Sequence, residues 1–313
     1  MFEISGLVFV YLTAQFNQNI QIPPAIGDIG NAVVQSFGDE GAAVADWLFE
    51  AARGATAFYD IDTPVTLRKL ADGDDEYLAA RQIPRFDLYL SFTGGPLLDE
   101  IGHRFGARRP RALYCSCDPA LHRPVRAEPR WELGYLGTYS ADRQPILDAL
   151  LVEPARRSPA GRFIVAGAQY PDDLRWPENV ERRQHVAPDA HASFYCAQRY
   201  TLNITRADMV RAGWSPSVRL FEAAACGVPI ISDAWPGIEQ FFEPGREIRI
   251  ANTSDEVLAI LDGMTEPERV ALAARARERV LRDHTATRRA ASLEAMTWEA
   301  LGRAVPAISE RGT

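Results

Sequence analysis

Residues 214–237 combine the residue types and the spacing of a helix start that binds an anion. Small hydroxyl residues precede an apolar helical pattern, and Arg219 follows one turn inside it. The first N–H groups of a helix lack partners within the helix, and the helix dipole is positive at the same end, so both favour a phosphate. Glu222 comes one turn later and offers two carboxylate oxygens to the hydroxyls of a ribose beside that phosphate. An ordinary capped helix before a parallel strand gives the same pattern, so the segment alone leaves the two interpretations equal.

The same residues predict a helix, a tight turn and a short buried strand. Ser215 or Ser217 can cap the helix, and Pro216 suits its first turn. Gly227 is expected to end the helix, because glycine adopts the left-handed conformation of that position at low cost. The apolar residues 228–231 then form the strand.

Strands and helices alternate along the rest of the chain, which predicts parallel sheets with right-handed crossovers. Further strands are expected at residues 7–12, 32–36, 55–59, 86–92, 112–114, 132–136, 162–167, 179–186, 200–204 and 247–251. Further helices are expected at 41–53, 63–71, 97–105, 143–151, 188–197, 254–264, 266–284 and 288–304, with Ser254 as the cap of the helix that it begins.

Polar residues follow the expected strands of the second half, at the edge where open parallel sheets bind ligands. They are Gly137, Thr138, Tyr139, Asn203, Arg206, Ser215, Pro216 and Ser217. The glycine of the first loop lets backbone N–H groups approach a phosphate, and Arg143 in the next helix can neutralise the charge of a leaving group. Taken alone, that loop is better explained as a plain strand–helix turn with a surface arginine. Convergence of the three loops on one crevice favours the ligand site.

In the first half, Asp60 and Asp62 end one expected strand, and Thr93, Gly94 and Gly95 end another. A carboxylate at such an edge can bind hydroxyls or take a proton from an attacking hydroxyl, and Asp60 is the better candidate. For Asp62 we favour a simpler role as the cap of the helix that follows it. The two aspartates could also hold a divalent ion, but the five histidines lack the spacing of a metal site.

Several of these motifs resemble one enzyme family. The run Ser-Pro-Ser-Val-Arg-Leu-Phe-Glu-Ala-Ala-Ala-Cys-Gly-Val-Pro at 215–229 resembles the donor-site signature of GT-B glycosyltransferases, in particular the CgeB-like spore-maturation group. Phe-Tyr-Asp-Ile-Asp-Thr-Pro at 58–64, Ser-Phe-Thr-Gly-Gly-Pro at 91–96 and Cys-Asp-Pro at 117–119 are similar to the same group. The resemblance covers residues 32–289. Related retaining enzymes often carry a second glutamate eight positions before Glu222, where this chain has Trp214.

The resemblance implies an α/β fold with two Rossmann-like, doubly wound parallel-sheet domains that face each other across a cleft. We expect an acceptor-side domain over residues 1–120 and a donor domain over 131–286. A C-terminal helix within 287–313 is expected to cross back to the first domain. The proline-rich, aperiodic segment 118–130 is expected to be a hinge. GT-B acceptor domains usually open with a strand and a glycine-rich loop, which is not found before residue 32, so we expect the first units of this domain to be missing, shortened or replaced.

Length and composition agree with a two-domain globular protein. The chain has 313 residues, of which 47% are hydrophobic and 24% charged. Its net charge of −8, with no basic stripe, argues against nucleic-acid binding. No transmembrane segment or signal peptide is expected. The four cysteines lack zinc spacing and are too few for a disulfide scaffold, so we expect them to be reduced, as in cytoplasm.

The function expected from these observations is transfer of a sugar, of the hexosyl type, from a nucleotide-diphosphate sugar to an unidentified hydroxyl acceptor. The resemblance implies a metal-independent and retaining reaction without a cofactor. We expect catalytic roles for Asp60, Arg143 and Arg219, and substrate binding by Asp62, Thr93, Gly94, Gly95, Gly137, Thr138, Tyr139, Asn203, Arg206, Ser215, Pro216, Ser217 and Glu222. Two alternatives stay open: a non-catalytic nucleotide-sugar binder or assembly protein, and a GT-B sugar-nucleotide epimerase.

Overall fold

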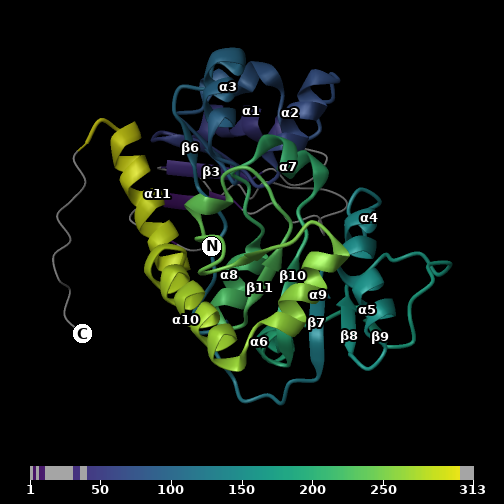
Figure 1. Cartoon of the computed structure of the whole chain (residues 1–313). Helices are drawn as coiled ribbons and strands as arrows, with labels where there is room; N and C mark the ends of the chain where they lie inside the picture. The colour runs from purple at the N-terminus through teal and green to yellow at the C-terminus, as the bar shows by residue number, and fades with distance from the viewer. Residues whose placement is uncertain (1–2, 5–6, 11–30, 36–40, 304–313) are drawn as a thin grey trace, which may run out of the picture. The chain divides into compact units, whose positions relative to one another are not determined.

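The structure, a computed structural model, describes residues 3–4, 7–10, 31–35 and 41–303 (Figure 1). The chain divides into two compact units, residues 1–114 with 289–313 and residues 115–288. Each unit is built around its own six-stranded sheet, so the expected α/β fold with two Rossmann-like units is confirmed. No helix in the described ranges is long and apolar enough to cross a lipid bilayer.

The strands of the first unit follow chain order across its sheet. They are β1 (Glu3–Ile4), β2 (Leu7–Val10), β3 (Asn31–Gln35), β4 (Thr56–Asp60), β5 (Leu88–Ser91) and β6 (Pro110–Ala112). All neighbours pair in parallel except β1, which is antiparallel to β2. Two strands therefore precede residue 31, so the sheet gives no support to the expectation of a reduced first domain. The expected position of the glycine-rich loop, residues 11–30, lies outside the described residues.

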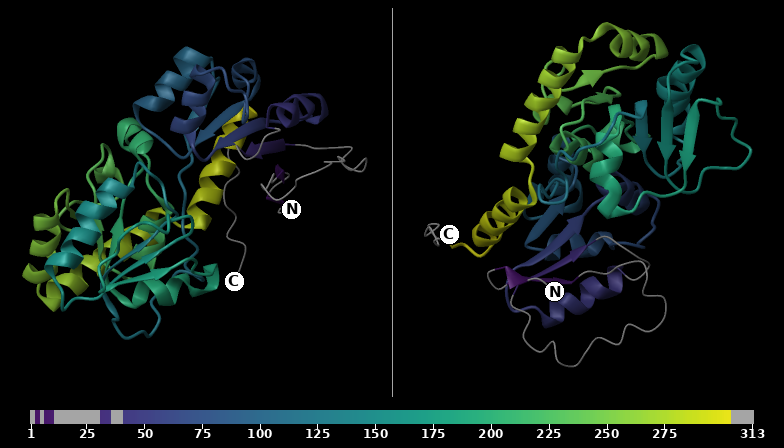
Figure 2. Two further views of the ribbon diagram at one scale, coloured as in Figure 1. Left: turned by 90° about the vertical axis from the view of Figure 1, so that its right-hand side faces the viewer. Right: turned by 90° about the horizontal axis from the view of Figure 1, so that it is seen from below.

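Helices cover both faces of this first sheet (Figures 1 and 2). They are α1 (Gly41–Ala51), α2 (Thr63–Ala71), α3 (Pro96–Phe105) and α11 (Ala286–Ala300), together with the 3-10 turn η1 (Ala80–Arg85). Side chains of a strand alternate between the two faces. Phe58 accordingly packs with Leu48 of α1 and Ile101 of α3. Its neighbour Ala57 joins a separate cluster with Leu293 of α11.

The second sheet is wholly parallel and has the order β12-β11-β10-β7-β8-β9. Its strands are β7 (Trp131–Leu136), β8 (Phe163–Ala166), β9 (Val180–Arg183), β10 (Gln198–Asn203), β11 (Ile230–Ser232) and β12 (Arg249–Ile250). The chain runs outward from β7 to β9 and then returns to place β10 on the other side of β7. This reversal between β7 and β10 is the topological switch point at which open α/β sheets bind ligands.

Eight helical segments surround the second sheet. They are α4 (Gln144–Leu147), the π-helical turn η2 (Asp148–Val152), α5 (Glu153–Arg157), α6 (His191–Cys196), α7 (Ala207–Ala212), α8 (Val218–Ala225), α9 (Ser254–Gly263) and α10 (Glu266–Asp283), and two 3-10 turns are η3 (Pro188–Ala190) and η4 (Ile238–Gln240). Leu150 of η2 and Val257 of α9 belong to the core cluster on one face. On the other side α8 lies against β10, α6 and α10.

Three local expectations are corrected by the structure. Helix α8 begins at Val218 with Ser217 at its N-cap, so Pro216 precedes the cap instead of lying in the first turn. The cap of α9 is Thr253, whose hydroxyl accepts from the Glu256 N–H at 3.2 Å, and not Ser254. The helix expected at 143–151 continues to 157 through the π-helical turn.

The expected hinge at 118–130 lies within the second unit and is bonded to it. The N–H of Val125 points to the sulfur of Cys196 at 3.5 Å. Just before the segment, the backbone of Cys117 bonds to His284 and Ala286, at 3.2 and 2.8 Å. The division between the units thus precedes the segment. All four cysteines are free thiols, as expected.

Replacing the fully buried Leu150 by alanine should lower the free energy of unfolding by about 2–5 kcal/mol, because it removes apolar contacts and leaves a cavity. The matched control is Leu121→Ala in the same unit, where the side chain is 64% exposed, and it should change stability by no more than about 0.5 kcal/mol. Denaturant unfolding of both variants measures the difference. Equal stabilities would show that the core cluster of the second unit is wrongly placed.

Candidate functional site

A buried arginine joins the two strands at the switch point of the second sheet. Arg219, in the first turn of α8, donates from Nε to the carbonyl oxygen of Leu136 at 2.6 Å and from Nη1 to Oδ1 of Asn203 at 2.9 Å. Leu136 ends β7 and Asn203 ends β10. The guanidinium also lies over the ring of Tyr135, 4.7 Å from its centre.

This arginine has no counter-ion among the residues that the structure describes. It is only 7% exposed, and its hydrogen bonds go to neutral oxygens. A buried charge without an ion pair is costly, since desolvation is not offset by an opposite charge. The planar guanidinium has a further nitrogen, Nη2, and its donors match the oxygens of a phosphate. The position therefore favours an anionic ligand.

A glycine turn packs closely against this guanidinium. A Cβ atom on Gly137 would lie 2.5 Å from the hydroxyl of Tyr135 and 3.0 Å from Nη2 of Arg219. The Tyr135 hydroxyl is buried and has no hydrogen-bond partner in the described part of the chain. A second glycine turn packs against the first, because a Cβ on Gly167 would lie 1.9 Å from the Gly137 carbonyl oxygen. Only glycine fits this close approach of two backbones.

The loop after β7 continues this site. Nη2 of Arg143 donates to the carbonyl oxygen of Thr138 at 2.6 Å, so its side chain lies over the loop that begins at Gly137. Asp142 connects this loop to the loop after β10, because its Oδ2 accepts from the N–H of Ala207 at 3.0 Å. Arg206 is the N-cap residue of α7, immediately before Ala207.

A polar network holds Asn203 in place from the opposite side. Its amide nitrogen lies 3.0 Å from the Ser232 hydroxyl and 3.3 Å from the Thr205 hydroxyl. The carboxylate of Asp233 accepts from the backbone N–H and the hydroxyl of Thr205, both at 2.9 Å. Burial raises the pKa of Asp233, although these hydrogen bonds and the charge of Arg219 oppose the rise. The network orients the Asn203 oxygen toward Arg219.

An aromatic pocket of about 270 Å³ adjoins the Gly137 loop at the ends of β8 and β9. Its walls include Tyr170, Trp176 and Arg182. The hydroxyl of Tyr170 donates to the carbonyl oxygen of Gly137 at 3.2 Å. The guanidinium of Arg182 lies 4.0 Å from the Tyr170 ring centre and 4.7 Å from that of Trp176. The pocket therefore offers flat faces and a cation next to the switch point.

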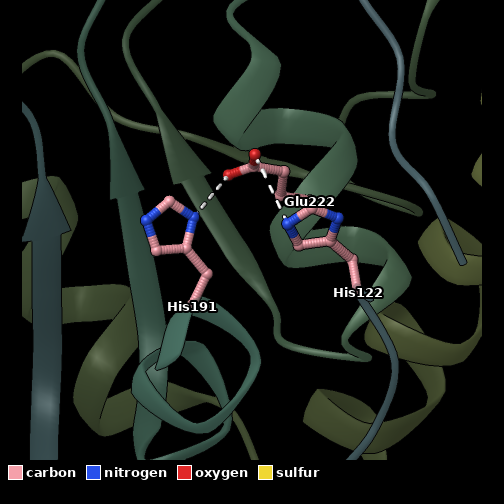
Figure 3. Close-up of side chains that lie close together, drawn as sticks. All are labelled: His122, His191 and Glu222. Atoms are coloured by element: carbon pink, nitrogen blue, oxygen red, sulfur yellow. Dashed lines mark ion pairs between the residues drawn. The ribbon is translucent and has the colours of Figure 1, made fainter. Parts of the chain in front are cut away.

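Glu222 lies one turn beyond Arg219 in α8 and meets two histidines (Figure 3). Its Oε1 lies 3.4 Å from Nε2 of His122, and its Oε2 lies 3.7 Å from Nδ1 of His191. The hydroxyl of Tyr195 donates to Oε2 at 2.9 Å. Burial, with the Glu222 carboxylate beside it, raises the pKa of the Tyr195 phenol well above its usual value, so this donor stays protonated. The histidines lack the spacing of a metal site in the sequence, but the fold brings two of them, 69 positions apart, to one carboxylate.

The loop before α8 is strained and closely packed. Trp214 has a φ of 45°, in the left-handed region that residues other than glycine rarely adopt. A Cβ atom on Gly237 would lie 2.5 Å from the Trp214 ring, so the indole covers this glycine. Ser215 is buried and donates to the sulfur of Met209 at 3.1 Å, and the carbonyl oxygen of Pro216 accepts from the Cys115 thiol at 3.3 Å. Ser217 is partly exposed at the N-cap, and its side chain makes no capping bond.

The remaining expected site residues lie in the first unit. Asp60 is fully buried, and its oxygens accept from Tyr89 at 2.6 Å and Thr66 at 2.9 Å. These bonds support a structural role and give no support to proton transfer. Asp62 occupies the N-cap position of α2, but its side chain makes no capping bond.

The other strand-end loop of the first unit is also buried at its start. Thr93 is fully buried, and its N–H donates to the Ser91 hydroxyl at 2.9 Å. Gly94 lies against the Tyr114 hydroxyl, with 1.9 Å to a Cβ placed there. Gly95 has a φ of 61° and is the N-cap of α3.

Replacing Gly137 by alanine should destabilise the second unit by about 1–3 kcal/mol, because the added methyl group would overlap the Tyr135 side chain. Gly263→Ala is the matched control, since a Cβ there meets no atom within 4 Å. Thermal unfolding of the two variants measures the difference. A Gly137→Ala protein as stable as the control would contradict the close packing described here.

Comparison with known proteins assigns a family to the second part of the chain. Residues 143–295 match the family model of glycosyl transferase-like proteins. No curated protein sequence matches the chain.

Solved structures share the fold at low sequence identity. Sucrose-phosphate synthase from Thermosynechococcus elongatus has a TM-score of 0.64 at 13% identity, over 87% of this chain and 74% of that chain. HepE of Anabaena, solved with UDP-glucose, has a TM-score of 0.62 at 15% identity, over 86% and 78%. The pneumococcal O-GlcNAc transferase GtfA, solved with UDP and GlcNAc, has a TM-score of 0.57 at 13% identity, over 86% of this chain but only 57% of that chain.

The matched segment contains Arg143, Asn203, Arg219 and Glu222, that is, the buried guanidinium and the side chains around it. A glycosyl transferase-like segment thus lies within a two-unit Rossmann-like fold of the GT-B type. The protein is accordingly an enzyme of the glycosyltransferase class.

Proposed function

We propose that the protein transfers a sugar, of the hexosyl type, from a nucleotide-diphosphate sugar to a hydroxyl acceptor. The observation that carries this proposal is the buried Arg219, which has no counter-ion in the described residues and lies at the switch point of the second sheet. A diphosphate supplies the missing negative charge. The structures of HepE and GtfA were solved with UDP-glucose and with UDP, so we take a UDP-sugar as the first donor to test.

The diphosphate would lie between the Gly137 loop and the start of α8. There Nη2 of Arg219 packs against the backbone of Gly137, 3.0 Å from the place that a Cβ would take. Arg143, over the same loop, is the second cation. Hydrogen bonds from fixed cations stabilise the charge that develops on the departing diphosphate, which is the main catalytic effect that this site can provide. Reaction would then need neither a metal ion nor a cofactor.

The ribose and the base of the nucleotide would lie beside Arg219, at Glu222 and in the aromatic pocket. We assign the ribose to Glu222, one turn along α8 from Arg219, because a carboxylate accepts two hydroxyl hydrogen bonds. The aromatic pocket at Tyr170 and Trp176 has flat faces suited to a base.

We also propose membership of the CgeB-like branch, a retaining outcome and a cytoplasmic location. The quoted motifs support the branch, and the free thiols agree with a reducing compartment.

The proposed domain roles follow the same assignment. The second unit would bind the donor and the first unit would bind the acceptor, with Asp62, Thr93 and the two glycines after Thr93 as candidate contacts. The burial of Asp60 makes it the weakest of the proposed catalytic residues.

One observation favours a second candidate, a nucleotide-sugar binder that does not transfer. Trp214 occupies the position where related retaining enzymes often have a glutamate, and its ring packs on Gly237. Incubation of a UDP-sugar with a panel of hydroxyl acceptors, followed by NMR, separates the candidates. A new glycoside supports transfer, an epimerised donor supports the epimerase, and a bound but unchanged donor supports the binder.

Replacing Glu222 by glutamine should weaken UDP binding by about 1.5–3 kcal/mol, because an acceptor of two hydroxyl bonds loses its charge. Calorimetry in EDTA measures the affinity. The same change should leave the affinity for 2′,3′-dideoxy-UDP unaltered, since that nucleotide lacks both hydroxyls. Glu239→Gln, at an exposed position of the same unit, is the control. Equal losses for both nucleotides would show that Glu222 does not bind the ribose.

Removing divalent metals with EDTA should not lower the transfer rate, because fixed arginines stabilise the leaving diphosphate. Initial rates with and without EDTA test this. A rate that falls in EDTA and recovers on addition of manganese or magnesium would contradict metal-independent transfer.

A further inference from the structure

We propose that His122, His191 and Glu222 form a binding site for a divalent transition-metal ion of the zinc type. The three residues come from separate parts of the second unit. His122 precedes β7, His191 opens α6, and Glu222 lies in the second turn of α8. Each offers one ligand atom, and these atoms all lie within 4.8 Å of one another. Figure 3 shows the carboxylate between the two imidazole rings.

The spacing of the ligand atoms suits coordination better than direct hydrogen bonding. The two nitrogen–oxygen distances, each to a different oxygen of Glu222, are 3.4 and 3.7 Å, longer than the 2.9 Å bond from Tyr195 to the same carboxylate. Zinc binds nitrogen and oxygen at about 2.0–2.1 Å in a tetrahedron, which places neighbouring ligand atoms about 3.3–3.4 Å apart. The ligand atoms of the three residues, which lie within 4.8 Å of one another, would move closer together around such an ion.

The chemistry of the group also suits a cation. Neutral imidazole nitrogens without a proton are acceptors, as are both oxygens of a carboxylate. Nδ1 of His122 is buried and has no hydrogen-bond partner among the described atoms. No hydrogen bond at Nδ1 therefore determines which of the two ring nitrogens carries the proton. Either protons or a metal ion must lie between the rings and the carboxylate.

The ligand types select the metal. Two imidazoles with one carboxylate suit zinc and its neighbours in the first transition row, whereas magnesium and calcium prefer oxygen ligands. Tyr195 donates to Oε2 of Glu222 and thus orients the carboxylate from outside the ligand set. All three side chains are at least four-fifths buried, yet none is closed off from solvent, so an ion can enter.

Metal binding at this site should also affect nucleotide binding, an inference that rests on the proposed function. The carboxylate that would hold the metal is the one assigned to the ribose. Zinc and the nucleotide should therefore compete for Glu222, so that zinc inhibits an enzyme that does not need it.

Titration of the tag-free protein with Co²⁺ tests the metal site without using activity. We expect one Co²⁺ per chain with the intense visible absorption of a low-coordinate site, displaced by Zn²⁺. His122→Gln and His191→Gln should each weaken binding by more than about 100-fold, beyond the loss typical for a partner outside the ligand set. Tyr195→Phe should weaken it about tenfold. His185→Gln, at an exposed histidine of the same unit, should leave it unchanged.

The proposal would be overturned if the wild-type protein did not bind one Co²⁺ per chain. It would also be overturned if His122→Gln and His191→Gln both bound Co²⁺ as tightly as the wild type. Circular dichroism confirms folding, and Tyr195→Phe supplies an independent variant if a histidine change unfolds the chain. UDP calorimetry with and without Zn²⁺ then separates the two proposals. Metal binding without any UDP binding refutes the donor site alone, and UDP binding without metal binding refutes the metal site alone.

Discussion

The second unit depends on one buried cation, the guanidinium of Arg219. Its hydrogen bonds to Leu136 and Asn203 connect the ends of β7 and β10, the two strands between which the chain reverses its direction across the sheet. Each charged hydrogen bond contributes about 1.5–3 kcal/mol, but burying the unpaired charge costs several kcal/mol. We therefore interpret the unpaired charge as a cost to folding stability that serves ligand binding. A bound anion removes the cost and leaves the hydrogen bonds intact.

The surrounding residues follow from the need to keep this cation in place and accessible. The network of Asn203, Ser232 and Asp233 fixes the acceptor on one side. On the other side, glycines at 137 and 167 let two strand-end turns meet without side chains between them. A side chain at either position would collide with neighbouring atoms, because a Cβ would lie 2.5 Å from the Tyr135 hydroxyl at Gly137 and 1.9 Å from the Gly137 carbonyl oxygen at Gly167.

Much of this could be predicted from local sequence patterns. Periodicity and turn residues located most strands and helices, and the run around Arg219 and Glu222 indicated the site because neighbouring residues on one helix keep their spacing. The cap of α9 was misplaced by one residue, since Thr253 and Ser254 are chemically similar and only the bond to Glu256 distinguishes them. The burial of Asp60 could not be predicted, because its partners Thr66 and Tyr89 come from other elements.

The meeting of His122, His191 and Glu222 was equally inaccessible from sequence. No local spacing relates a residue before β7 to one in α6 and one in α8. Proximity arises there from the path of the chain through the second unit. The aromatic pocket at Tyr170 and Trp176 is similar, because Arg182 joins it from the next strand.

The most direct test of the account compares UDP with uridine by calorimetry, on the wild-type protein and on Arg219→Gln. If Arg219 binds the diphosphate, the wild type should bind UDP more tightly than uridine, and the substitution should reduce that preference by about 10- to 150-fold. The affinity for uridine itself should change little. A preference for UDP that survives the loss of Arg219 would contradict the central claim that this buried cation is the diphosphate site.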